Sequence, residues 1–249
     1  MAINTEKNSY TVLFATIMVA VVGTVLAFLA SSLSDKIKEN ERLEKQQNIL
    51  YAMGINQNKG EGSVSFIPTD QVAGEFSKYI KEQLVIEGDE ITQDDQAYLI
   101  DLKKQATAAK NGQTRKLPLF IGDKNGSKFY IIPMRGKGLW DAIWGFIALD
   151  ENMVVQGVYF DHAAETPGLG ANIKQRYFMD DFTGESILEG TKYAGIAVAK
   201  GNNDPLNKIK DDNEVDALAG ATITGNGVSA MISESVNLYK DYLETIRVK

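Results

Sequence analysis

The sequence predicts an α+β fold, in which an antiparallel sheet with packed helices is preceded by one N-terminal transmembrane helix. Three observations support this prediction. Short segments rich in β-branched and aromatic residues, separated by turn sequences, follow one another between residues 117 and 160. An uncharged apolar run lies near the N-terminus, and an apolar pattern of helical spacing ends the chain.

Composition limits the possible functions. A chain of 249 residues with 44% hydrophobic content has enough apolar side chains for a packed core, in one large domain or two small ones. Its net charge is −7 and its basic residues are scattered, so we expect no nucleic-acid partner. The chain has no cysteine, which excludes disulfides and thiolate-ligated iron–sulfur clusters. Any redox role must therefore use a cofactor that needs no thiol.

The N-terminal segment predicts a membrane anchor. No charged residue occurs from Asn8 to Ser34, and the apolar core from Tyr10 to Leu29 would span about 30 Å as a helix. We expect a short tail at residues 1–9 and a transmembrane helix at residues 10–33. A cleaved signal peptide ending near Ala30 is the alternative, although its apolar region would be long and its positive region weak.

A stalk helix and a mixed helical region are expected at residues 34–116. Charged residues dominate the start of the stalk, apolar residues recur at helical spacing toward its end, and Gly54 is expected to terminate it. Further helices are predicted at residues 73–85 and 94–109. We assign no chemistry to this region.

The remainder, residues 117–249, has the pattern of one domain. Strands are predicted at residues 117–121, 128–134, 143–149 and 153–160, followed by a helix at 172–178, a strand at 193–199 and a helix at 227–246. One face of the last helix is apolar, and we expect it to pack on the sheet. That face consists of Val228, Met231, Ile232, Val236, Tyr239, Tyr242, Leu243 and Ile246.

A loop of small residues precedes the last predicted helix, with the sequence DALAGATITGNG from Asp216 to Gly227. Its glycines allow close approach of a ligand, and the amides that open a helix favour a phosphate. The loop also carries hydroxyls at Thr222 and Thr224. The alternative is that Thr224 or Asn226 only caps the helix.

Two further motifs lie at the ends of predicted strands: GKGLW at residues 136–140 and HAAETPGLG at residues 162–170. Taken singly, each has an ordinary explanation as a turn. In order with the glycine loop, they resemble the FMN-binding domain shared by the C subunits of sodium-translocating NADH:quinone oxidoreductases and the G subunits of Rnf complexes. The segment at residues 44–54 also resembles the C subunits.

The glycine loop resembles the flavinylation motif D-x-x-(S/T)-G-A-T-x-(S/T), in which the last hydroxyl is esterified to the FMN phosphate. Matched residue by residue, that hydroxyl belongs to Thr224. Two positions depart from the pattern: Ala219 stands where Ser or Thr is usual, and Ala217 where glycine is frequent. The resemblance implies that a separate flavin transferase makes the bond with FAD as donor.

The resemblance also implies a flavin site within an FMN-binding domain at residues 117–249. Its expected cofactor-binding residues are Thr222, Gly220, Ala221, Trp140, Glu165, Thr166, Gly168 and Leu169. We expect Trp140 and Leu169 to cover the isoalloxazine ring, and Glu165 and Thr166 to offer hydrogen bonds. A glutamate here could instead hold the turn through backbone amides. We expect neither catalytic residues nor metal ligands in this chain.

The implied function is that of a membrane-anchored flavoprotein subunit that relays electrons within a sodium-translocating NADH:quinone oxidoreductase, alongside its other subunits. Such a subunit is expected in the inner membrane with its FMN domain on the periplasmic side, although Lys36, Lys38 and Arg42 after the anchor favour the opposite orientation. The alternatives are a G-type subunit of an Rnf complex and a membrane-tethered binding or sensor domain without cofactor.

Overall fold

The computed structural model of the chain describes residues 7–60, 62–201, 204 and 207–247. Most of the predicted N-terminal tail, residues 1–6, lies outside the described residues. The chain divides into two compact units, residues 1–42 and residues 43–249. The second unit has the α+β architecture that the sequence predicts, with a six-stranded antiparallel sheet.

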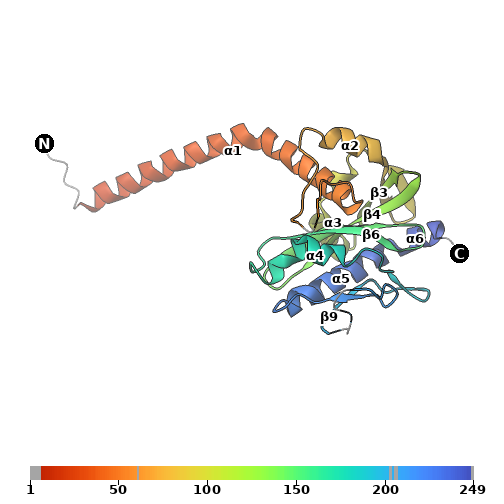
Figure 1. Ribbon diagram of the computed structural model, residues 1–249. Helices are drawn as coiled ribbons and strands as arrows, with labels where there is room; N and C mark the ends of the chain where they lie inside the picture. The colour runs from red at the N-terminus through yellow and green to blue at the C-terminus, as the bar shows by residue number, and fades with distance from the viewer. Residues whose placement is uncertain (1–6, 61, 202–203, 205–206, 248–249) are drawn as a thin grey trace. The chain divides into compact units, whose positions relative to one another are not determined.

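The chain begins with the long helix α1, Asn8–Ala52, coloured red to orange in Figure 1. Its apolar part has a mean hydropathy of 2.7 and none of it is buried in the chain, so this helix is long and apolar enough to cross a membrane. Large side chains such as Val19 and Phe28 are more than two-thirds exposed. An apolar surface of this extent is stable only when lipid or another protein covers it.

The last two turns of α1 belong to the core of the second unit. Residues 48–52 are buried, and Ile49 and Leu50 are completely inaccessible to solvent. The interpretation of this segment as only a juxtamembrane stalk is therefore wrong for its C-terminal part. The helix ends before Gly54, whose φ of +71° is the left-handed conformation common at helix ends, as the sequence predicts.

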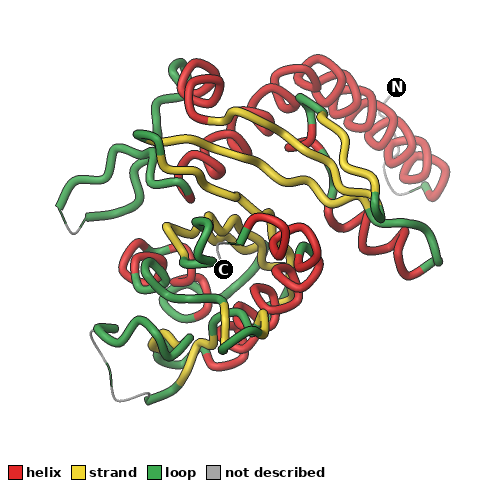
Figure 2. The backbone as a smooth tube through the Cα atoms, turned by 90° about the vertical axis from the view of Figure 1, so that its right-hand side faces the viewer, coloured by secondary structure: helices red, strands yellow, loops and turns green. Residues whose placement is uncertain are grey.

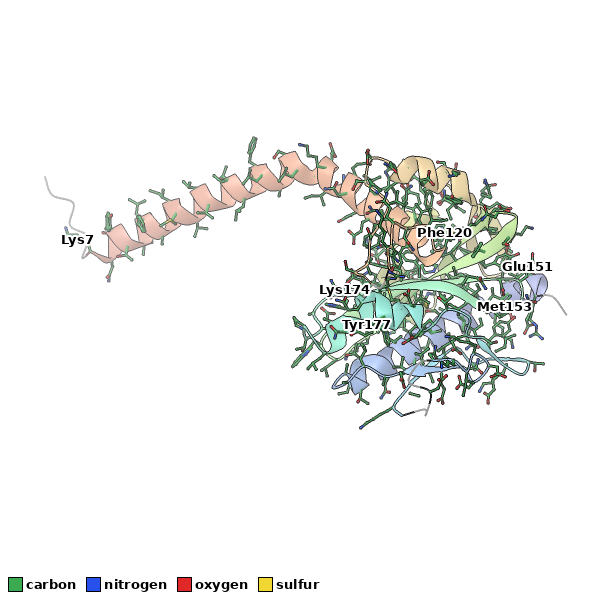
Figure 3. The ribbon with its side chains drawn as sticks, in the orientation of Figure 1. Lys7, Phe120, Glu151, Met153, Lys174 and Tyr177 are labelled. Atoms are coloured by element: carbon green, nitrogen blue, oxygen red, sulfur yellow. The ribbon has the colours of Figure 1, made fainter. Side chains whose placement is uncertain are left out.

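Six strands form the main sheet in the order β2-β1-β3-β4-β5-β6, with every neighbouring pair antiparallel. Phe120, labelled in Figure 3, lies completely buried in this sheet. The four strands predicted between residues 117 and 160 are all present. The six strands are β1 Ile80–Glu87, β2 Glu90–Gln93, β3 Lys116–Lys124, β4 Ser127–Lys137, β5 Ala142–Leu149 and β6 Val155–His162.

The region expected to be mixed helical contributes two of these strands, which corrects the sequence interpretation. The helix predicted at residues 73–85 ends at Tyr79, because α2 spans only Val72–Tyr79 and the chain continues as β1. The helix predicted at residues 94–109 is a 3₁₀ turn, Ala97–Leu99, followed by α3, Leu102–Lys110. The boundary expected at residue 117 thus falls at the start of β3, which pairs with β1 in the same sheet.

Different helices cover the two faces of the sheet, as the yellow strands and red helices of Figure 2 show. On one face, the end of α1 approaches so closely that a Cβ at Gly122 would overlap the methyl carbon of Met53. On the other face, α5, Thr222–Leu238, packs against β4, where a Cβ at Gly136 would lie 2.7 Å from Met231 Cβ. Gly136 is therefore a place where α5 touches the sheet, and Gly122 is a place where the residue that follows α1 touches it.

The second face is completed by short elements. Next to β6 lie a 3₁₀ turn, Gly170–Lys174, and α4, Arg176–Asp180, and the ring of Phe160 on β6 packs against Phe178 and Phe182. The strand predicted at residues 193–199 is divided into β8, Lys192–Tyr193, and β9, Ala197–Ala199. β8 pairs with β7, Leu188–Glu189, and β9 pairs in parallel with β10, Glu214–Asp216.

The predicted final helix is two helices, α5 and α6, Lys240–Ile246, which meet at Tyr239. Its predicted apolar face does pack on the core: six of its eight side chains are buried, and Tyr242 and Ile246 are partly buried against the others. The helix begins earlier than residue 227. This change places Thr224 inside the first turn of α5.

Candidate functional site

A pocket of about 250 Å³ lies at the N-terminal end of α5. Three segments form it: the turn after β4, the segment after β6, and the first turn of α5. These segments contain the three sequence motifs, so the fold brings all three to one place. The lining residues are Leu139, Glu165, Thr166, Leu169, Gly170, Gly220, Ala221, Thr222, Ile223 and Thr224.

The first turn of α5 offers hydrogen-bond donors to this pocket. The N-cap residue is Ala221, whose side chain has no oxygen to accept from the amides that follow. The first helical bond runs from the Gly225 amide to the Ala221 carbonyl at 2.8 Å. The amides of residues 222–224 precede that bond and have no acceptor four residues earlier within the helix. An anion in the pocket would satisfy these donors and interact favourably with the helix dipole.

The helical start at Thr222 corrects two sequence interpretations. The stretch was expected to be a loop because glycine inside a helix costs about 1 kcal/mol relative to alanine. Packing requires these glycines: a Cβ at Gly225 would lie 3.0 Å from Val198, and one at Gly227 would overlap the Lys137 carbonyl. Because Thr224 lies inside α5, the interpretation of this residue as a helix cap is wrong.

A buried hydrogen bond connects two of the motifs. The Thr224 hydroxyl lies 2.5 Å from Glu165 Oε2, and these residues are separated by 59 positions in the sequence. Both are nearly inaccessible to solvent, with 1% of Thr224 and 4% of Glu165 exposed. The other carboxylate oxygen, Oε1, accepts the backbone amide of Trp140 at 3.0 Å. The carboxylate is thus held between the turn after β4 and the start of α5.

Glycines on both sides make room for this carboxylate. A Cβ at Gly138 would lie 2.5 Å from Glu165 Oε1, and a Cβ at Gly170 would overlap both Glu165 Oε2 and Thr224 Oγ1. These positions therefore accommodate the Thr224–Glu165 pair. Gly168 has a φ of +77°, which a turn requires, and it does not line the pocket.

His162 contacts the backbone of Glu165. Its Nδ1 accepts the backbone amide of Glu165 at 3.2 Å, which assigns the ring proton to Nε2 in the neutral tautomer. Nε2 is buried and has no hydrogen-bond partner among the described residues. Beside it, Asp161 accepts the Tyr159 hydroxyl at 3.2 Å and lies 3.8 Å from Lys174, which is labelled in Figure 3. Burial, assisted by the Asp161 charge, raises the pKa of Tyr159, so this phenol stays neutral and donates.

Exposed apolar side chains surround the mouth of the pocket. Leu139, Leu169 and Ile223 line the pocket, and each is more than two-fifths exposed. Trp140 is 66% exposed and lies beside them, where its indole nitrogen donates to Thr166 Oγ1 at 3.1 Å. A planar apolar group at the mouth of the pocket would cover this surface.

The comparisons with known proteins agree with this geometry. The FMN-binding domain family matches residues 138–237, which include Gly138, Glu165 and Thr224. The crystal structure of the C subunit of Na(+)-translocating NADH-quinone reductase from Parabacteroides distasonis is 30% identical and superposes with a TM-score of 0.71, covering 85% of this chain and 96% of that one. The chain belongs to this C-subunit family. The family resemblance stated from the sequence is therefore confirmed.

Curated members of the C-subunit family match over nearly the whole chain. The C subunit from Vibrio anguillarum is 28% identical over 244 residues, which cover 92% of this chain and 90% of that protein. The C subunit from Yersinia pestis is 29% identical over 238 residues, which cover 90% of this chain and 87% of that protein. The similarity extends beyond the FMN-binding domain and includes most of the N-terminal region.

Most of the residues that the sequence singled out meet in the pocket of this family member. Seven of the nine line it: Thr222, Thr224, Gly220, Ala221, Glu165, Thr166 and Leu169. Trp140 lies at its mouth and Gly168 is outside its lining. Three lining residues are not among the expected cofactor-binding residues: Leu139, Gly170 and Ile223. All three lie inside the motifs, and each is next in sequence to an expected residue.

Proposed function

We propose that this chain carries FMN in phosphodiester linkage to Thr224 and relays electrons through that flavin within a Na(+)-translocating NADH-quinone reductase. The observation that carries the proposal is the position of Thr224, which lines a pocket at the first turn of α5 and donates its hydroxyl to Glu165 there. The surrounding sequence matches the flavinylation motif at the residues that define the acceptor hydroxyl. Two lines of support therefore agree: membership of the C-subunit family, and an acceptor hydroxyl at a site suited to phosphate.

The residues present fit an FMN phosphate. A phosphate esterified to Thr224 would lie next to the first-turn amides of α5, which lack a side-chain cap. Thr222, at the first position of the same helix, is exposed and lines the pocket. Gly220 and Leu169 pack against each other, since a Cβ at Gly220 would lie 2.8 Å from Leu169 Cδ2. These contacts shape a phosphate site without any basic side chain in the lining.

The size of the pocket favours a position of the isoalloxazine ring at its mouth. A volume of about 250 Å³ holds the phosphate and part of the ribityl chain, but it is below the range of pockets that enclose a whole ligand of this size. The exposed side chains of Leu139, Trp140 and Ile223 would cover one face of the ring. The other face would remain accessible, as electron exchange with neighbouring subunits requires. Covalent attachment would prevent loss of a flavin bound so openly.

We propose that a separate flavin transferase, with FAD as the donor, attaches the FMN to this chain. We further propose that α1 is retained as a single membrane anchor at residues 10–33, and that residues 117–249 form the FMN-binding domain on the periplasmic side. The other subunits of the reductase are the proposed partners. In this scheme the whole complex oxidises NADH, reduces quinone and moves sodium.

The attachment is tested by co-expression with a flavin transferase, followed by a denaturing gel viewed under ultraviolet light. The wild-type band and the Thr222→Val band should fluoresce, whereas the Thr224→Val band should be dark. Thr222→Val is a matched control because it removes the neighbouring hydroxyl. A dark wild-type band would contradict covalent FMN, and co-purification with Rnf subunits in place of reductase subunits would contradict the proposed complex.

Sidedness can be tested separately because the chain has no native cysteine. Glu189 is exposed on the β7–β8 hairpin, so Glu189→Cys supplies a single reactive thiol. A membrane-impermeant maleimide should label this variant in cells whose outer membrane is permeable and whose inner membrane is intact. Labelling only after the inner membrane is broken would contradict the periplasmic orientation.

A further inference from the structure

The Thr224 hydroxyl has one proton, and the geometry directs that proton to Glu165. Oε2 of Glu165 lies 2.5 Å from Thr224 Oγ1, and a carboxylate can only accept while a hydroxyl can donate. The pair is shielded from water, which would otherwise compete for the same hydrogen bond. Trp140 holds the second carboxylate oxygen through its backbone amide, so the orientation of the carboxylate is fixed.

A threonine hydroxyl is a weak nucleophile until a base removes its proton. A general base must lie within hydrogen-bond reach of the atom that loses the proton, and Glu165 meets this requirement. Gly138 and Gly170 keep space for the carboxylate at this position, since a Cβ at either residue would overlap it. The arrangement therefore places a base beside the acceptor hydroxyl within the chain that is to be modified.

We propose that Glu165 is the general base for flavin attachment, so that the acceptor chain supplies a catalytic group for its own modification. This inference rests on the proposed FMN linkage at Thr224. In the reaction, Thr224 Oγ1 forms a bond to the phosphorus atom of the FMN half of FAD. The phosphoanhydride bond breaks, AMP leaves with the electron pair, and the Thr224 proton passes to Glu165 Oε2. Nothing is oxidised or reduced.

A variant of Glu165 can distinguish a general base from a residue that only holds the local structure. Glu165→Gln has nearly the same shape and keeps an oxygen that can accept the Trp140 amide, but an amide does not take up a proton. A base contributes a factor of about 10²–10⁴ to the rate of such a step. The initial rate of flavin attachment should therefore fall about 10²–10⁴-fold in Glu165→Gln, and Glu165→Asp should recover part of the loss.

The experiment uses the full chain in detergent, purified without flavin from a host that lacks the transferase. Purified flavin transferase and FAD are added, and intact-protein mass spectrometry follows the modified fraction with time. Glu185→Gln is the matched control, because Glu185 is also fully buried but pairs with Lys210 and does not line the pocket. This control should react at the wild-type rate. Thermal melts and equilibrium binding of free FMN establish that each variant is folded and retains its pocket.

A folded Glu165→Gln chain that binds FMN and is modified at the wild-type rate would overturn the role of Glu165 while leaving the FMN linkage intact. A wild-type chain that is never modified would instead overturn the linkage itself. If Glu165→Gln does not fold, Glu165→Asp tests the proposal in its place. That variant should react measurably more slowly than wild type, and an unchanged rate would overturn the proposal.

Discussion

Replacing Thr224 by valine should destabilise the flavin-free chain, although the two side chains have nearly the same shape. The hydroxyl of Thr224 donates to the buried Glu165 carboxylate at 2.5 Å, and valine cannot replace this bond. A hydrogen bond to a charged group contributes about 1.5–3 kcal/mol to the free energy of unfolding. For a chain of this size, that loss corresponds to a fall of about 3–12 °C in the melting temperature.

The assay is a set of thermal melts of four full-length chains in the same detergent: wild type, Thr224→Val, Glu165→Gln and the double variant. Because the two residues touch, their effects should not add. Thr224→Val should cost less than about 1.5 kcal/mol in the Glu165→Gln background, where only a neutral bond remains to be lost. Thr224→Ser, which keeps the hydroxyl, serves as the control for side-chain volume. Additive effects, or a Thr224→Val chain that melts with wild type, would refute the reasoning.

Three further predictions follow, of which two concern residues next to the Thr224–Glu165 pair and one concerns the buried carboxylate of Glu185. Gly170→Ala should lower both the melting temperature and the yield of covalent FMN, because the added Cβ overlaps Glu165 and Thr224; normal yield and stability would show that the close approach is not required. Trp140→Ala should change the free energy of unfolding by less than about 0.5 kcal/mol, because the side chain is 66% exposed, but it should increase flavin fluorescence by removing a neighbouring indole; unchanged fluorescence would place the ring elsewhere. Burial raises the pKa of Glu185 above its ordinary 4.5, and the charge of Lys210 opposes this shift. The folded chain therefore binds a proton at Glu185 more tightly than the unfolded chain, so the free energy of unfolding should fall as the pH rises above about 4.5. The melting temperature should depend less on pH in Glu185→Gln than in wild type, and the same pH dependence in both chains would contradict a raised pKa for Glu185.

The sequence predicts much of the sheet because its central strands carry strong local signals. Residues 117–160 combine β-branched and aromatic side chains with clear turns, and all four expected strands are present. The first strand was missed because Lys81, Glu82, Gln83 and Leu84 are good helix formers. In the structure β1 pairs along its length with β3, and this tertiary pairing outweighs local propensity.

The candidate site was predicted in part for the same reason. Its motifs could be recognised because each is continuous in sequence and rich in residues with special backbone or chemical properties. Their mutual contacts could not be predicted, since Glu165 and Thr224 lie 59 positions apart and no local pattern links them. The start of α5 was misplaced because Gly225 and Gly227 suggest a loop, whereas close packing against Val198 and Lys137 accounts for both glycines.

The central claim is tested most directly by peptide mass spectrometry of the chain isolated from its native membrane. The peptide containing residues 222–224 should carry the added mass of FMN less one water, and fragmentation should assign this mass to Thr224. An unmodified peptide, or a flavin assigned to Thr222, would contradict covalent attachment at Thr224.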